Sequence, residues 1–134
     1  MATIKTIYPG DLRTEATHLQ SGTKIITDAP TDNHGKGEAF SPTDLLAASL
    51  GSCIATTMGI KANDHQINID GLKMTITKVM ASNPRRIAEV IVDIEMPKKE
   101  FSEKEKLLLE HTALHCPVAK SLHPDLKQTI VFSY

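Results

Sequence analysis

The first thirty positions predict three short β-strands, because apolar and polar residues alternate over residues 11–19 and β-branched residues run together over residues 23–27. A turn is expected at Pro9-Gly10, because this dipeptide interrupts extended chain. Residues 28–40 contain few large apolar side chains and predict a long loop, a kind of segment that often carries function. The predicted strands are residues 2–8, 11–19 and 23–27.

A long central helix is predicted to begin at Ser41. Ser41 suits the N-cap, Pro42 suits the first helical position, and Asp44 places negative charge at the positive end of the helix dipole. The helix should end near Asn63, and its apolar residues cover nearly every side, which is typical of a helix inside a protein or an oligomer. Its most apolar run, residues 45–60, is shorter than the roughly 18–20 residues of a membrane span, so we expect no membrane partner.

The second half of the chain predicts a hairpin, two helices and a last strand. The hairpin strands are residues 72–80 and 87–96; in the second, Val90, Val92, Ile94 and Met96 lie on one face, and the opposite face carries Glu89, Asp93 and Glu95. Ser102 and Glu105 form a capping-box pattern, and Cys116-Pro117 starts a short helix before a strand at 128–134. The order βββ-α-ββ-αα-β is an α+β fold, and residues 1–134 are expected to form a single domain.

Composition narrows the function classes. The 134 residues are 40% hydrophobic and 23% charged, which excludes a disordered chain. Fifteen basic and sixteen acidic residues with no Trp give neither a basic surface nor stacking platforms, so no nucleic-acid partner is expected. The N-terminal residues lack a secretory pattern, which predicts a cytoplasmic protein.

The two cysteines, Cys53 and Cys116, leave three interpretations open: inert buried thiols, half of a metal site, or a redox dithiol. Cys116 at a helix N-cap can have a lowered pKa, and His115 can add positive charge, although Cys116 could also simply cap the helix. Cys53 lies in an apolar helix that raises a thiol pKa, so a reactive Cys53 needs a cationic partner from elsewhere.

Metal and cofactor signals are weak. His111 and His115 have a spacing that can chelate a metal, with Cys116 and His123 close behind, but the Glu of the zinc-protease pattern is missing. Histidines facing solvent near a helix end are the better interpretation. The glycines around Lys36 form too short a motif for a phosphate loop. We therefore expect no bound cofactor and no metal.

Two segments together resemble the OsmC/Ohr family of osmotically induced and organic-hydroperoxide-resistance proteins: SPTDLLAASLGSCIATTMGI around Cys53 and HCPVAKSL around Cys116. The likeness covers nearly the whole chain. It implies an intertwined homodimer, with central helices between two antiparallel sheets and active sites at the subunit interface.

The resemblance also implies the chemistry of a thiol peroxidase. Cys53 would attack a small hydroperoxide and become a sulfenic acid, and Cys116 would condense with it to a disulfide. An external dithiol reductant would then restore both thiols.

One departure from the family concerns the activating cation. The family's peroxidases hold an Arg by a Glu in an Asn-Pro-Glu opening of the central helix, where this chain has Thr43. Arg13 is the expected cation and Glu38 its substitute partner, with Lys36 a further candidate and Asp44 one position past the family Glu. The departure indicates a slow peroxidase or a different electrophile. The alternative is a dimeric protein that binds a small ligand or senses redox state, with little turnover.

Overall fold

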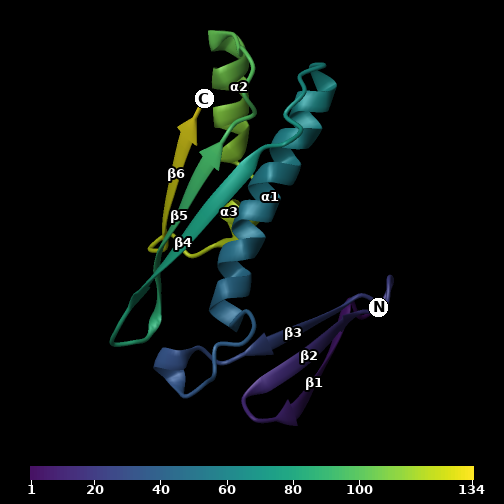
Figure 1. Ribbon diagram of the computed structural model, residues 1–134, viewed down its shortest axis with the longest axis vertical. Coiled ribbons are helices and arrows are strands. Elements are labelled where there is room, and N and C mark those ends of the chain that lie inside the picture. The colour runs from purple at the N-terminus through teal and green to yellow at the C-terminus, as the bar shows by residue number, and fades with distance from the viewer. The chain divides into compact units, whose positions relative to one another are not determined.

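The computed structural model describes residues Met1–Tyr134, which form two compact units (Figure 1). The first unit comprises Met1–Leu46 and the second Ala47–Tyr134, so the boundary falls near the start of the long helix. The predicted order βββ-α-ββ-αα-β is confirmed, with a short 3-10 turn added at Thr31–Asn33.

The first unit contains an antiparallel sheet in the order β1-β2-β3. The predicted turn at Pro9-Gly10 is displaced, because β1 continues through both residues. The reversal instead occurs at Asp11 and Leu12, which have φ of 57° and 61°. Two central residues with positive φ suit the twist of a tight hairpin. The strands are Ile4–Gly10 (β1), Arg13–His18 (β2) and Lys24–Asp28 (β3).

The long helix α1 spans Pro42–Asp64, close to its predicted limits. Its start is held by a reciprocal cap: the Ser41 hydroxyl accepts from the Asp44 N–H at 3.1 Å, and the Asp44 carboxylate accepts from the Ser41 N–H at 2.9 Å. The predicted N-cap is therefore confirmed. Its buried residues form one stripe at helical spacing: Ala47, Leu50, Gly51, Ile54, Met58 and Ala62.

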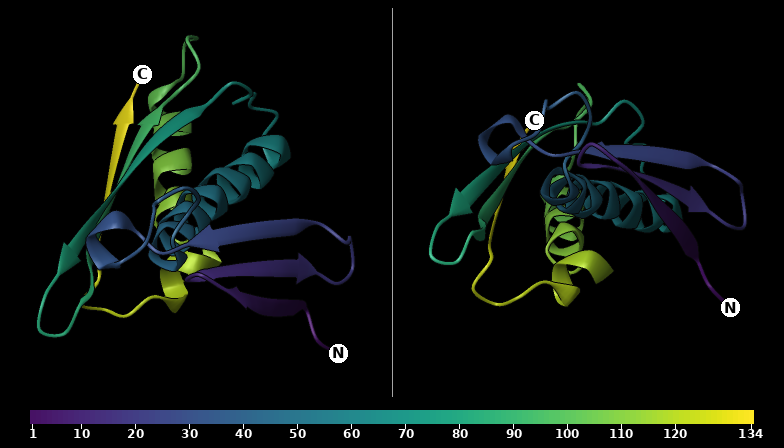
Figure 2. Two further views of the ribbon diagram at one scale, coloured as in Figure 1. Left: turned by 60° about the horizontal axis from the view of Figure 1, so that its bottom comes forward. Right: turned by 90° about the horizontal axis from the view of Figure 1, so that it is seen from below.

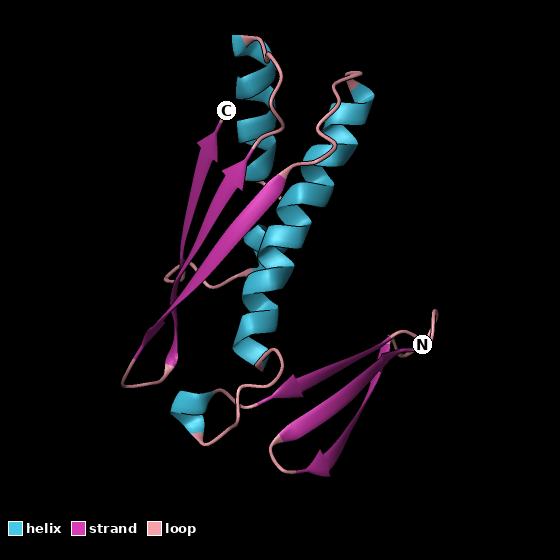
Figure 3. Ribbon diagram, viewed as in Figure 1, coloured by secondary structure: helices cyan, strands magenta, loops and turns pink.

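The second unit contains a sheet in the order β4-β5-β6 (Figure 3). The hairpin of β4 (Lys73–Ala81) and β5 (Arg86–Glu95) is antiparallel, as predicted. β6 (Lys127–Ser133) pairs with β5 in parallel, so this sheet is mixed where a purely antiparallel one was expected. Parallel pairing requires a long crossover, and α2 (Glu103–Ala113) and α3 (Pro117–Ser121) provide it.

The helices of the second unit lie on one face of its sheet (Figure 2), and the core is formed by side chains from these helices and from the sheet. Gly51 of α1 packs so closely on β4 that an added Cβ would lie 2.3 Å from the Ile76 Cδ1 atom. Most of the fully buried side chains of this unit come from α1, β5 and α2, among them Leu50, Ile54, Met58, Val90, Val92 and Leu109.

By length and composition alone, α1 would suffice to cross a membrane: it has 23 residues and a mean hydropathy of 1.4 over its most apolar window. The sequence predicted an apolar segment too short to span a membrane, and the length of α1 does not support that prediction. A single such helix is weak evidence, since core helices of soluble proteins meet the same criteria.

Candidate active site

Cys53 lies in the middle of α1 and is half-buried against the core of the second unit. Its neighbour one helical turn later is Thr57, whose Oγ1 lies 3.9 Å from the Cys53 Sγ. Residues four apart share one face of a helix, which places the hydroxyl beside the sulfur. Thr57 was not singled out from the sequence, although this spacing is the signal that points to it.

Cys116 is the N-cap of α3, as predicted, with Pro117 at the first helical position. Its side chain is fully buried, and its Sγ accepts a hydrogen bond from the Ala119 N–H at 3.4 Å. Extended backbone at Cys116 turns the sulfur back toward the free N–H groups of the first turn. The thiol is thus held in a fixed place by the helix that it caps.

The structure brings the two thiols into contact, although they are far apart in the sequence. Burial raises the pKa of Cys53, but hydrogen bonds from the Val118 N–H, the Cys116 thiol and the Thr57 hydroxyl outweigh it, so the pKa of Cys53 is lowered. Burial likewise raises the pKa of Cys116. Its bond to Cys53 and the charge of that sulfur raise it further, against the opposing N–H bond of Ala119. Cys53 is therefore the stronger acid of the pair.

The groups that lower the Cys53 pKa are uncharged donors of its own unit. The sequence had indicated that an apolar helix needs a cation to produce a reactive thiolate. Here the α3 backbone and a hydroxyl supply part of that stabilisation. Both cysteines are free thiols, so the pair is in its reduced form.

Arg13 and Glu38 are paired within the first unit. The Arg13 Nη2 lies 2.5 Å from the Glu38 Oε2 and 3.5 Å from the Asp28 Oδ2. The hydrogen bond to Glu38 and the charge of Asp28 raise the pKa of Arg13, so the guanidinium stays charged. Glu38 thus holds Arg13, in the way the sequence suggested for a substitute partner. Asp28 was missed, because no local pattern marks it as different from any polar residue that ends a strand.

The other candidates near the helix start have different surroundings. The Asp44 carboxylate caps α1, so it serves the helix end. The Thr43 hydroxyl lies 3.2 Å from that of Ser41. Lys36 is exposed in the loop before α1.

The histidines of α2 stack on each other. The ring centroids of His111 and His115 are 4.3 Å apart, and the His115 Nδ1 bonds to the His111 carbonyl at 2.7 Å. No group of three or more His, Cys, Asp or Glu side chains is arranged to hold a metal ion. The metal interpretation therefore gains no support from the geometry.

The chain is thus a two-cysteine α+β protein, with one thiol on the long helix α1 and the second at the N-cap of the short helix α3. A family model described as OsmC-like protein matches residues 35–131. The chain belongs to the OsmC-like family.

Solved structures agree with this assignment. An osmotic stress induced and detoxification response protein of Psychrobacter arcticus, described as putative, is 56% identical, with a TM-score of 0.95 over 99% of this chain and 96% of its own. Two organic hydroperoxide resistance proteins share the fold at lower identity. The Legionella pneumophila protein is 17% identical (TM-score 0.78, 100% and 98% covered), and that of Elizabethkingia anophelis is 15% identical (0.75, 99% and 96%). No curated protein matches the sequence.

Proposed function

We propose that the protein reduces organic hydroperoxides, with Cys53 as the attacking thiol and Cys116 as the resolving thiol. The observation that carries the proposal is the contact between the two thiols and the opposite direction of their pKa shifts. A thiolate is the nucleophilic form of cysteine, so the thiol with the lower pKa is the one that reacts first. The family and its relatives named for hydroperoxide resistance support a role in stress or redox chemistry.

The reaction proceeds in three balanced steps. The Cys53 thiolate attacks the terminal oxygen of the hydroperoxide, the O–O bond breaks, and the departing alkoxide takes a proton to become an alcohol. Cys53 is then a sulfenic acid. The Cys116 sulfur attacks the Cys53 sulfur, forms a disulfide and releases water. An external dithiol reduces this disulfide by exchange and is itself oxidised.

The coupling between the thiols orders these steps. The charge of Cys53 is one cause that raises the pKa of Cys116. Oxidation of Cys53 to a neutral sulfenic acid removes that charge, so the pKa of Cys116 falls once it is needed as a nucleophile. The resolving thiol is thereby held back until the first step has occurred.

Arg13 is the proposed cation that supports the Cys53 thiolate, with Glu38 as the residue that orients it. Its support is the ion pair of Arg13 with Glu38, which fixes a charged guanidinium at the start of β2, the central strand of the first sheet. Exchange of Arg13 for Ala should slow oxidation of Cys53, whereas exchange for Lys keeps the charge and loses the planar fork.

A homodimer is the proposed assembly. No helix of the first unit covers its sheet, and apolar residues of the two outer strands, β1 and β3, are exposed. Ile60 on α1 is likewise 60% exposed, away from the buried stripe. Apolar surface of this kind marks an interaction site in a native protein. Sedimentation should give twice the chain mass, and a monomer at micromolar concentration would contradict the dimer. The exposed strand residues are Ile4, Ile7, Tyr8, Ile25 and Ile26.

The proposed chemistry requires two small-molecule partners, a hydroperoxide and a dithiol reductant, and no bound cofactor. The proposed location is the cytoplasm, where thiols are kept reduced.

The first test is intact mass with thiol counting, before and after one equivalent of cumene hydroperoxide. Loss of two hydrogens and both thiols is expected, with a lasting sulfenic or higher acid in Cys116→Ser. The Cys53→Ser variant should not consume peroxide. Two thiols that stay reduced in the unaltered protein would contradict the proposal.

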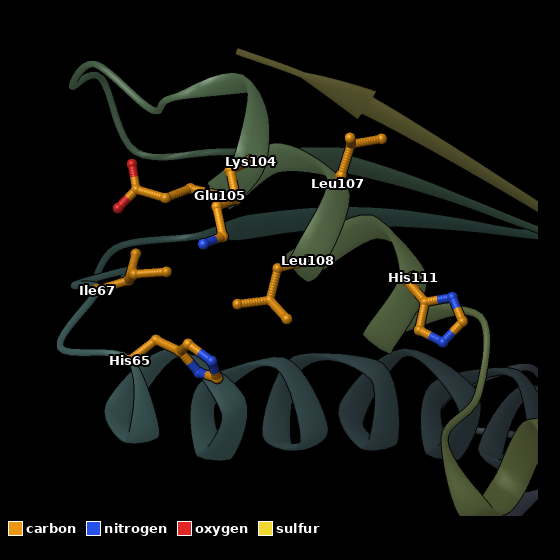
Figure 4. Close-up of a pocket in the computed structure, with 7 residues that line it drawn as sticks. All are labelled: His65, Ile67, Lys104, Glu105, Leu107, Leu108 and His111. Atoms are coloured by element: carbon orange, nitrogen blue, oxygen red, sulfur yellow. The ribbon is translucent and has the colours of Figure 1, made fainter.

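A second candidate function, binding of a small ligand, is favoured by a pocket in the second unit (Figure 4). Its volume is about 440 Å³, and its aliphatic side chains lie beside the Lys104 ammonium. These features suit a short fatty acid. Octanoate should then raise the melting temperature of the unaltered protein and not of Lys104→Ala, since a ligand that binds only the folded state stabilises it. The lining residues are His65, Ile67, Lys104, Glu105, Leu107, Leu108 and His111.

A further inference from the structure

A buried carboxylate lies at the end of β3. Asp28 is 1% exposed and stands directly opposite Arg13 of β2 in the sheet register. Its Oδ2 accepts a hydrogen bond from the Glu38 N–H at 3.0 Å and lies 3.5 Å from the Arg13 Nη2. Charged side chains are rarely buried to this degree unless they are paired. The two contacts of the Asp28 carboxylate are therefore with Arg13, the proposed cation, and with Glu38, the residue proposed to orient it.

The three residues form a closed set of contacts. Arg13 bonds to the Glu38 side chain, Asp28 bonds to the Glu38 main chain, and Asp28 pairs with Arg13. The side chains of Arg13 and Glu38 are 35% and 58% exposed. An exposed ion pair by itself is weak, because water and salt compete with it. The buried Asp28 is therefore the fixed member against which the other two are placed.

The loop that carries Glu38 is tied to the same strand end. The Asp28 N–H donates to the Phe40 carbonyl at 3.0 Å, and the Gly37 N–H donates to the Ala29 carbonyl at 3.2 Å. These bonds close the loop from residue 29 to residue 40 at its base. The Asp28 carboxylate also accepts a hydrogen bond from the Glu38 backbone N–H, so it fixes the position of the Glu38 main chain.

We propose that Asp28 is a positioning residue that holds the Glu38 loop and the Arg13 guanidinium in one arrangement, and thereby sets the reactivity of Cys53. The second part rests on the proposed function, in which Arg13 supports the Cys53 thiolate. Asp28 touches neither peroxide nor sulfur in this scheme. Its effect is transmitted through Arg13, so it should vanish when Arg13 is absent.

The test combines a rate with a conformational readout. The rate is that of Cys53 oxidation by cumene hydroperoxide in a single turnover. Asp28→Ala should lower it about fivefold to tenfold when Arg13 is present and less than about twofold in an Arg13→Ala background, since contacting residues are coupled. The second readout is tryptic cleavage after Lys36, which should rise about tenfold in Asp28→Ala because the loop opens more often.

Two further variants keep the test decisive if Asp28→Ala folds poorly. Asp28→Asn retains an oxygen acceptor for the Glu38 N–H but no charge for Arg13, so cleavage should stay near that of the unaltered protein while the oxidation rate falls. Glu15→Ala removes a carboxylate from β2 that pairs with Lys24 and not with the loop. It should change neither readout.

The outcomes separate the positioning role from the function. An equal loss of rate with and without Arg13, or no change in rate and cleavage, would overturn the role of Asp28. A Cys53 that no hydroperoxide oxidises, in the unaltered protein, would overturn the proposed function and with it the effect on Cys53. The cleavage assay still decides in that case whether Asp28 holds the loop.

Discussion

The Cys53 and Cys116 thiols hydrogen-bond to each other, and this contact shifts their pKa values in opposite directions. Cys53 takes the role of acceptor and Cys116 that of donor, which favours the charged form of one thiol and the neutral form of the other. This contact adds to the effects of burial, which is the main cause of the raised pKa of Cys116, and of the Val118 N–H, which is the main group that lowers the pKa of Cys53.

Exchange of Cys116 for Ala should raise the pKa of Cys53, because a donor to its thiolate is lost. The rate of Cys53 alkylation by iodoacetamide, followed against pH, should reach half its maximum at a higher pH than in the unaltered protein. In Cys53→Ser, the remaining Cys116 should be alkylated only at still higher pH and slowly, since it is buried. Superimposable profiles for the unaltered protein and Cys116→Ala would contradict the assigned contact.

Exchange of Thr57 for Val should also raise the pKa of Cys53, since it removes a hydroxyl 3.9 Å from the sulfur. Alkylation of Cys53 near neutral pH should slow by about twofold to tenfold, the range of one ordinary hydrogen bond. Thr57→Ser keeps the hydroxyl and should stay close to the unaltered rate. Thr56→Val makes the same chemical change at an exposed neighbour and serves as the matched control. Equal slowing in both valine variants would show that Thr57 has no special role.

The helix N-termini were predictable from the sequence because capping depends on residues that are close in the sequence. The Ser102–Glu105 capping box and the Cys116 N-cap each depend on residues three positions apart, and both are present as expected. The element order followed from periodicity in the same way. The exception is the first hairpin. Pro9-Gly10 is the more typical turn sequence, but the turn is formed by Asp11 and Leu12.

The contacts between distant residues that form the candidate site were harder to predict from the sequence. Arg13 and Glu38 are 25 positions apart and meet only because the loop folds back on β3. The direction of β6 likewise depends on where two helices return the chain to the sheet, which periodicity does not contain. The pairing of Cys53 with Cys116 came from the resemblance to a family and not from the residue pattern.

Exchange of Gly35 for Ala should destabilise the loop before α1. An added Cβ would lie only 1.7 Å from the Ala29 carbonyl oxygen, a backbone atom that has no flexible side chain to move aside. The loop must open to accept it, so cleavage by trypsin after Lys36 should increase. Gly59→Ala offers the contrast, since nothing lies within 4 Å of the added Cβ in the helix. It should raise the free energy of unfolding by about 0.5–1 kcal/mol in urea. Similar urea midpoints and similar cleavage for both variants would contradict this account.

Exchange of Tyr134 for Phe should change how stability depends on alkaline pH. The Tyr134 hydroxyl donates to the Glu110 carboxylate at 2.6 Å. Burial, followed by this bond and the charge of Glu110, raises the Tyr134 pKa above its usual value. A raised pKa in the folded state means that the unfolded chain releases this proton first. The contribution of the group is therefore complete below about pH 10 and is lost as the pH rises further.

Urea unfolding at several pH values measures this effect. Tyr134→Phe should be less stable by about 1 kcal/mol at neutral pH, the usual cost of one lost hydrogen bond. Its free energy of unfolding should then fall less steeply above about pH 10, because it lacks the group that titrates there, so the two curves converge. Parallel curves for Tyr134→Phe and the unaltered protein would show that the contact with Glu110 does not shift the titration of Tyr134.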